Sequence, residues 1–191
     1  PYCMDGSFLL ALRNNLLERF TKSLSAEYVL PSIFGNIHFG DPNPNRVLQA
    51  KLLLDKVGIG GYHTFQMDSP DERGEWVKNM NAKEFNVVIM NPPYVERDGG
   101  GLNDDSGKAI YPEHVTNAQK RANVVTCVIP DKWMLGGRGT NKFRADMLKD
   151  KQVRKIYVYP DSKKPFPHAN IPGGICYFTW QKDTTGPCKV T

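Results

Sequence analysis

Apolar residues follow two spacings that alternate along the chain. From Ser7 to Phe20 they recur three and four positions apart, which is typical of an amphipathic helix. From Phe85 to Met90 they form a short continuous run, which indicates a buried strand. The same patterns predict strands at 36–40, 62–67, 124–129, 153–159 and 175–181, and helices at 44–54, 111–121 and after Thr140. Strands that alternate with helices predict an α/β fold with a doubly wound, mostly parallel sheet.

Several helix starts carry capping residues. Asn43 suits an N-cap, and Pro44 suits the first helical position after it. Residues 69–72, Ser-Pro-Asp-Glu, have the capping-box pattern. We also expect Thr140 to cap the helix that carries Phe143.

Composition narrows the class of protein. A chain of 191 residues, 40% of them hydrophobic, is long enough for one domain with a substantial core, and no clear boundary divides it. No apolar run reaches membrane length, so no membrane partner is expected. The four cysteines form no CxxC pair, and Cys127 and Cys176 lie in apolar runs that favour small buried hydrophobes over metal ligands. We therefore expect a cytoplasmic chain without a metal site.

Positive charge is concentrated in one region. The net charge is +5, and residues 132–164 contain ten Lys or Arg against three Asp. Such a surface favours a polyanion and predicts binding that weakens with salt. The candidates for contact with a nucleic-acid backbone are Lys132, Arg138, Lys142, Lys163 and Lys164. An ordinary solvated face is the alternative.

The tetrapeptide Asn91-Pro92-Pro93-Tyr94 directly follows the strand at 85–90. The carboxyl edge of an open α/β sheet is where ligands bind. Prolines have a fixed φ and no backbone N–H, so the carbonyls here are held in place. A planar NH2 group on a conjugated ring suits this corner: the Asn91 side-chain oxygen and the Pro92 carbonyl would each accept one hydrogen, and Tyr94 would stack on the ring. The alternative is a proline-rich turn with a capping Asn.

This tetrapeptide resembles motif IV of amino-methyltransferases that use S-adenosylmethionine. Further blocks, in the same order, are similar to the adenine-specific (N6) DNA methyltransferases of restriction–modification enzymes: residues 1–10 to motif I, 40–44 to motif II, 67–68 to motif III, and 124–130, 133–139, 143–144 and 173–178 to the later catalytic domain. The resemblance implies a Rossmann-like class I methyltransferase fold, S-adenosylmethionine as cofactor and double-stranded DNA as substrate.

The resemblance also assigns the start of the chain to cofactor binding. The loop containing Cys3, Asp5 and Gly6, with Phe8 after it, is expected to approach the methionine part of the cofactor. Phe8 is equally suited to the core. Met4 stands where the family usually has glycine; if that position needs positive φ, the strain would weaken cofactor binding.

Two aspartates at strand ends are further cofactor candidates. Asp41 would accept hydrogen bonds from the ribose hydroxyls, as acidic residues do in dinucleotide folds. Asp68 would accept from the cofactor's adenine amine. The alternatives are a carboxylate placed at a helix N-terminus for Asp41 and a turn aspartate for Asp68.

The expected reaction needs no metal and no activated base. Acceptors on both amine hydrogens favour a lone pair localised on nitrogen, which displaces the methyl group in line from the sulfonium. Because the amine is inaccessible in a duplex, the base must be flipped out. Tyr94 would cover one face and Phe166, in a Phe-Pro pair similar to a later motif of relatives, the other; the alternative is that Phe166 packs on the core. The Gly- and Asp-rich segment 97–108 would close over DNA, or is a disordered insertion.

The resemblance also bears on how much of the domain is present. Relatives place a central first strand before motif I, and residue 1 already lies inside that motif. We therefore expect a catalytic-domain piece of a longer bacterial or archaeal polypeptide that lacks this strand and the target-recognition region, fused or bound to a nuclease and a recognition domain.

The sequence alone is compatible with three functions. The first is methylation of adenine N6 in DNA. The second is methylation of another planar amine, a protein glutamine or an RNA base. The third is a catalytically weak module that binds cofactor or DNA in a larger assembly. Residues 136–139 and 173–178 and the basic region favour DNA.

Overall fold

The structure of the chain is a computed structural model that describes residues 7–20, 33–35, 37–41, 43–66, 85–96, 107–137, 139–169 and 171–191. Its contacts divide it into two compact units, Pro1–Glu72 and Arg73–Thr191. Within the described residues, no helix is both long enough and apolar enough to cross a membrane.

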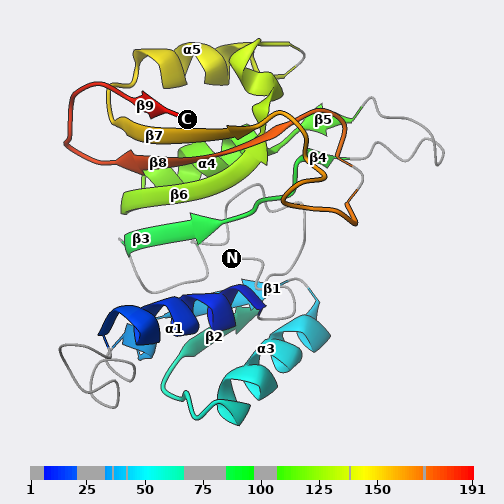
Figure 1. The fold of residues 1–191 in the computed structure, drawn as a ribbon, viewed down its shortest axis with the longest axis vertical. Coiled ribbons are helices and arrows are strands. Elements are labelled where there is room, and N and C mark those ends of the chain that lie inside the picture. The colour runs from blue at the N-terminus through cyan, green and yellow to red at the C-terminus, as the bar shows by residue number, and fades with distance from the viewer. Residues whose placement is uncertain are drawn as a thin grey trace. The chain divides into compact units, whose positions relative to one another are not determined.

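The first unit is a strand–helix–strand arrangement with a second helix (Figure 1). Strand β1 (His38–Asp41) pairs in parallel with β2 (His63–Gln66), and α3 (Pro44–Lys56) connects them. Residues Ser7–Phe20 form helix α1, as the spacing of their apolar residues predicts, and this helix packs against α3. The core of this unit consists of Leu9, Phe34, Phe39, Ala50, Leu54 and Ile59.

Local sequence signals account for the start of α3. The Asn43 side chain accepts a hydrogen bond from the Asn45 N–H at 3.0 Å, which confirms Asn43 as the N-cap, and Pro44 opens the helix. The capping-box pattern at residues 69–72 lies outside the described residues.

The second unit is built on a five-stranded sheet in the order β3-β6-β8-β7-β9. Its strands are β3 (Phe85–Met90), β6 (Ala122–Pro130), β7 (Val153–Tyr159), β8 (Ile175–Gln181) and β9 (Lys189–Val190). β3 and β6 are parallel, with Met90 opposite Cys127. The α/β fold with a mostly parallel sheet is confirmed, because four of these five strands point the same way.

Strand β8 runs against both of its neighbours, which the hydrophobic pattern does not reveal. Parallel neighbours require a crossover connection, usually a helix, whereas β7 and β8 are joined by residues 160–174, a stretch rich in turns and without a helix among its described residues. The chain therefore turns back at the same edge of the sheet and pairs antiparallel.

Short elements complete the unit (Figure 1). Helix α4 (Tyr111–Gln119) packs on β6, and the 3₁₀ helix η2 (Asp131–Met134) contacts α5 (Asn141–Lys149). β4 (Val95–Glu96) and β5 (Lys108–Ala109) pair antiparallel. Lys108, expected in a mobile segment, is therefore a strand residue; residues 97–106 lie outside the described part of the chain.

Two expectations about single residues have different outcomes. Cys127 and Cys176 are fully buried, as predicted, and burial raises the pKa of both thiols. Thr140 stands at the N-cap of α5 but makes no capping hydrogen bond; its hydroxyl instead donates to the Gly137 carbonyl at 3.3 Å. The capping mechanism predicted for Thr140 is therefore wrong, because its backbone is helical, not extended.

His114 on α4 is fully buried, and this burial lowers the pKa of its imidazole from 6.5 to about 4. In the unfolded chain His114 therefore binds a proton at a higher pH than in the folded chain. Its contribution to the free energy of unfolding is fully present above pH 6.5 and is lost as the pH falls towards 4. Between pH 6.5 and 4, we expect the free energy of unfolding to fall by up to about 3 kcal/mol less in His114→Gln than in the wild type.

Urea unfolding at a series of pH values measures this slope. The exposed His168 supplies the matched control, His168→Gln, which should keep the wild-type slope. An unchanged slope in His114→Gln would contradict the prediction, whatever that variant's absolute stability.

Candidate active site

Four strands of the second unit, β3, β6, β7 and β8, each have one end at the same edge of its sheet. Strands β3 and β6 both end there, because they are parallel, and Pro130 at the end of β6 lies opposite Ile175 at the start of β8. Ile175 in turn lies opposite Tyr159, the end of β7. Residues 91–94, η2 and the connection 160–174 therefore leave the same edge of the sheet.

The Asn-Pro-Pro-Tyr segment begins at this edge. Asn91 is exposed, Pro92 is buried, and Pro93 and Tyr94 are half-buried. The Tyr94 carbonyl accepts from the Ile110 N–H at 3.1 Å, which ties the end of the segment to the start of α4. No backbone hydrogen bond reaches the Pro92 carbonyl among the described residues. The corner thus combines an exposed Asn91 with a buried Pro92, and the roles of their two oxygens as amine acceptors stay a prediction.

The Asn91 side chain has a partner that sequence analysis did not foresee. The Tyr94 hydroxyl donates a hydrogen bond to Asn91 Oδ1 at 2.8 Å. Asn91 Oδ1 has a second lone pair, so it can accept a further hydrogen bond. Tyr94 is thereby joined to the amide acceptor as well as offering a ring for stacking.

A chain of aromatic rings supports Tyr94 from inside the unit. Tyr94 and Tyr111 meet edge to face, with ring centroids 6.4 Å apart, and Tyr111 meets Phe143 in the same way at 6.0 Å. Phe143 contacts Trp133 at 5.5 Å, and the Trp133 indole N–H donates to Cys176 Sγ at 3.3 Å. Edge-to-face pairs are favourable beyond the area they bury. Tyr94 therefore sits on a fixed aromatic support.

Burial controls the protonation of this cluster. It raises the pKa of the Tyr94 and Tyr111 hydroxyls well above their usual value of 10.0, and the nearby Cys176 thiol contributes to both shifts. Both hydroxyls therefore stay protonated, as hydrogen-bond donors, at any pH near neutrality.

Gly174 allows the connection 160–174 to meet η2 closely. A Cβ at this position would lie 2.6 Å from the Tyr159 carbonyl and would also overlap the Asp131 carboxylate. The Asp131 N–H donates to the Gly174 carbonyl at 3.1 Å. The Gly-Gly block of the sequence thus locks the start of β8 against the end of β6.

Phe166 lies in a connection held by its own hydrogen bonds. Its N–H donates to the Ser162 carbonyl at 3.0 Å, and the buried Ser162 hydroxyl donates to the Ile171 carbonyl at 2.8 Å. Phe166 is half-buried and shares an edge of the sheet with Tyr94, although no ring contact joins the two among the described residues. Its role against a flipped base stays a prediction.

The candidate DNA-contacting cations divide into two groups. Lys132, Lys163 and Lys164 are exposed on η2 and on the connection 160–174, at the edge that carries Asn91. Lys142 instead pairs with Asp146 one turn along α5, with the Lys142 amine 2.6 Å from the Asp146 carboxylate. Its charge is already balanced locally, which weakens the case for a phosphate contact. Arg138 lies outside the described residues.

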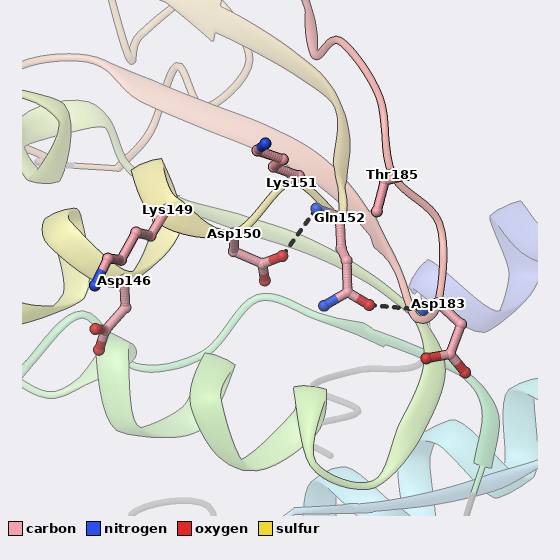
Figure 2. A pocket seen from close by; sticks show the side chains of 7 residues that line it. All are labelled: Asp146, Lys149, Asp150, Lys151, Gln152, Asp183 and Thr185. Carbon is pink, nitrogen blue, oxygen red and sulfur yellow. Dashed lines mark hydrogen bonds between the residues drawn. The ribbon is translucent and has the colours of Figure 1, made fainter.

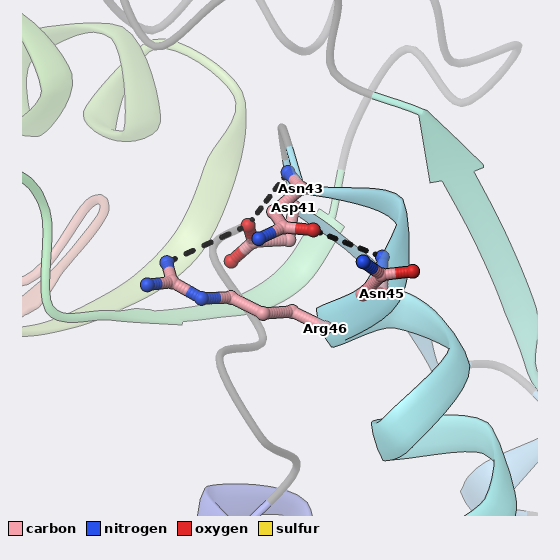
Figure 3. A network of polar contacts seen from close by, with 4 residues as sticks. All are labelled: Asp41, Asn43, Asn45 and Arg46. Carbon is pink, nitrogen blue, oxygen red and sulfur yellow. Dashed lines mark hydrogen bonds and ion pairs between the residues drawn. The ribbon is translucent and has the colours of Figure 1, made fainter.

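In the first unit, Asp41 ends β1 and is fully buried. Figure 3 shows it beside Asn43 and Arg46. Its Oδ1 accepts from the Asn43 N–H at 2.9 Å and lies 3.7 Å from the guanidinium of Arg46 in the first turn of α3. This is the helix-anchoring arrangement that was the alternative for Asp41. Its contact with a ribose stays a prediction.

The remaining cofactor candidates lie at the start of the chain and after β2. Cys3, Asp5, Gly6 and Asp68 fall outside the described residues, as does Met4. Phe8 belongs to α1, but its side chain is outside the described part.

An open groove lies at the opposite edge of the five-stranded sheet (Figure 2). It is lined by residues around the start of β7 and the end of β8: Asp146, Lys149, Asp150, Lys151, Gln152, Asp183 and Thr185. Gln152 binds the turn after β8 by accepting from the Asp183 N–H at 2.6 Å. The groove is remote from Asn91 because Gln152 precedes β7, whereas Asn91 follows β3.

Residues 11–166 match the family of Eco57I restriction-modification methylases. The chain belongs to this family. The match covers both units and includes the Asn-Pro-Pro-Tyr corner and Phe166. The family inferred from the order of the sequence blocks, a methyltransferase of the restriction–modification type, is thereby confirmed.

A curated relative of the chain agrees with this family. An uncharacterized adenine-specific methylase of Mycoplasma pneumoniae is 31% identical over 153 residues, which are 79% of this chain and 36% of that protein. The chain thus spans about a third of the length of this curated relative.

Solved structures of methyltransferases share the fold. The M protein of the type I restriction enzyme EcoKI is similar with a TM-score of 0.66 and 15% identity, over 97% of this chain and 40% of that one. A Listeria monocytogenes protein assigned to the class I S-adenosylmethionine-dependent methyltransferases is similar with a TM-score of 0.64 and 13% identity, over 99% of this chain and 55% of that one. These similarities confirm the class I methyltransferase fold.

The candidate site also contains residues that sequence reasoning missed. The ring chain through Tyr111 and Phe143 is one example, and the Asp131–Gly174 contact is another. Trp133 and Gly174 lie in blocks that the sequence singled out, but their partners Cys176 and Asp131 are 43 residues away in sequence.

Gly174→Ala tests the close packing at this edge. The new methyl group would overlap the Tyr159 backbone carbonyl and the Asp131 carboxylate, so we expect a loss of about 1–3 kcal/mol in the free energy of unfolding. Denaturant unfolding measures it. Gly60→Ala is the matched control, since a Cβ there has no neighbour within 4 Å; equal stability of the two variants would contradict the packing.

Proposed function

We propose that this chain is the catalytic-domain part of an enzyme that transfers a methyl group from S-adenosylmethionine to the N6 amine of a flipped adenine in DNA. The observation that carries the proposal is the corner formed by Asn91 and Pro92, where an exposed amide and a rigid carbonyl leave the carboxyl end of β3. Membership of a restriction-modification methylase family supports the type of reaction and of substrate.

The chemistry follows from the two acceptors. Asn91 Oδ1 and the Pro92 carbonyl each accept a hydrogen bond from the amine, so the nitrogen lone pair is drawn out of conjugation with the ring. The nitrogen lone pair would then be available to accept the methyl group that the bound cofactor would supply. The acceptors stabilise the positive charge that develops on the amine, and the proton leaves after transfer.

The first unit carries the candidates for the cofactor. Asp41 is proposed for the ribose hydroxyls and Asp68 for the cofactor's adenine amine, while Cys3, Asp5, Gly6 and Phe8 are proposed for the methionine part. S-adenosylmethionine supplies the methyl group when bound. Asp41 can bind ribose through its carboxylate only if its side chain becomes accessible, since it is fully buried beside α3 in this structure.

DNA is proposed to lie across the edge that carries Lys132, Lys163 and Lys164, whose charges would contact phosphates. We also propose that the whole protein acts in the cytoplasm together with a nuclease and a target-recognition region, as the restriction–modification assignment of its family suggests.

Asn91→Ala tests the amine-acceptor role. Loss of an acceptor used in the transition state should reduce kcat by about 10²–10³-fold and leave cofactor affinity nearly unchanged. Transfer of labelled methyl groups to DNA free of adenine methylation measures the rate, and calorimetry measures the affinity. Asn123→Ala removes an exposed Asn at the opposite edge and should be neutral. Turnover of Asn91→Ala within about tenfold of wild type would refute the assignment.

Phe166→Ala tests capture of the extruded base. Loss of one stacking face is worth about 1–3 kcal/mol, so we expect DNA affinity to fall by about tenfold or more, with a weaker signal from a fluorescent base analogue at the target position. Phe85→Ala, which truncates a half-buried Phe at the start of β3, is the control. An unchanged fluorescence signal in Phe166→Ala would remove this residue from the base site.

A further inference from the structure

The hydrogen bond from the Tyr94 hydroxyl to Asn91 Oδ1, 2.8 Å long, gives Tyr94 a second task. We propose that Tyr94 is a positioning residue whose hydroxyl fixes the orientation of the Asn91 side-chain amide, so that Oδ1 faces the incoming amine. This inference rests on the proposed function and adds to it a role for the hydroxyl, separate from stacking by the ring.

Orientation matters because the two ends of a side-chain amide are similar in shape and opposite in hydrogen bonding. The oxygen of Asn91 accepts two hydrogen bonds, whereas the nitrogen is a double donor. A half-turn of the amide would set its NH2 against the NH2 of the substrate, and the amine would lose one of its two acceptors. Asn91 is exposed, so surrounding packing does not fix its amide.

The two prolines remove the usual local solution. An Asn side-chain oxygen in a turn commonly accepts from the backbone N–H two residues later. That residue is Pro93, which has no N–H, and Pro92 has none either. The Tyr94 hydroxyl supplies the donor that the prolines cannot, and it does so from the residue directly after them.

The hydroxyl is suited to act as a donor. The oxygen lone pairs of a phenol are delocalised into the ring, so it donates more strongly than it accepts, which favours Oδ1 over the amide nitrogen as its partner. Burial keeps the pKa of Tyr94 far above neutrality, so the proton is present throughout the working range. The edge-to-face contact with Tyr111 holds the ring, and hence the hydroxyl, in place.

The second lone pair of Oδ1 completes the argument. With the Tyr94 hydroxyl on one lone pair, the other is directed away from it and accepts the amine hydrogen. Tyr94 can therefore orient Asn91 and stack on the base in the same complex, without breaking the bond seen here.

Tyr94→Phe in the full-length protein separates the two tasks, because it keeps the ring and removes the donor. We expect kcat to fall by about tenfold, the effect of one neutral hydrogen bond, with cofactor affinity and the base-analogue fluorescence unchanged. Tyr62→Phe is the matched control. Tyr62 directly precedes β2, and its hydroxyl donates to Asp55 Oδ1 at 2.7 Å. Loss of this hydroxyl should leave kcat unchanged.

A double-mutant cycle with Asn91→Asp identifies the mechanism. The two oxygens of a carboxylate are equivalent, so an Asp at this position has no wrong orientation. In that background Tyr94→Phe should change kcat by no more than about twofold. A merely structural hydroxyl would instead cause the same tenfold loss in both backgrounds.

The outcomes are distinct. If the wild-type protein methylates DNA adenine and Tyr94→Phe does so at the same rate or faster, the positioning role is overturned and the proposed function stands. A loss of equal size in the wild-type and Asn91→Asp backgrounds would overturn it as well. Absence of transfer to DNA adenine by the wild-type protein would refute the proposed function, and the inference would fall with it.

Discussion

Parallel pairing of β3 with β6 decides where the chemistry of this chain lies. It sets Met90 opposite Cys127, so both strands deliver their carboxyl ends to one edge of the sheet. Val88 and Met90 are buried on the strand, and a slip of one residue would exchange the faces and turn the end of β3 away. The antiparallel return of β8 then brings the connection that carries Phe166 and two lysines to that same edge.

At this edge, rigidity comes from covalent structure and orientation comes from a single hydrogen bond. The Pro-Pro pair fixes the backbone and holds the Pro92 carbonyl, but it also removes the backbone donors that would orient Asn91. Tyr94 compensates through its hydroxyl, and its ring is held by Tyr111 and Phe143 behind it. The side chains of this short motif are thus held in place only when segments about 50 residues apart in sequence pack together.

In the first unit, one buried carboxylate anchors a helix and is also proposed for the ribose of the cofactor. Asp41 ends β1, where a cofactor ribose would be expected, and it also satisfies a backbone N–H at the start of α3 and faces Arg46. The carboxylate has about four acceptor positions, so it can keep its anchoring contacts and also bind a ligand once its buried side chain becomes accessible. The anchoring contacts fix where this carboxylate points before any ligand arrives.

By itself, the sequence determined the elements and the family. Hydrophobic spacing placed the strands and helices within a few residues, because burial on one face is encoded locally, and the N-cap at Asn43 and the corner at 91–94 depend on residues next to one another. Tertiary structure alone decided the direction of β8, the partner of Asn91 Oδ1, the ring chain behind Tyr94 and the fit of Gly174 against Asp131. These features depend on contacts between segments distant in sequence, and such contacts exist only once the sheet has formed.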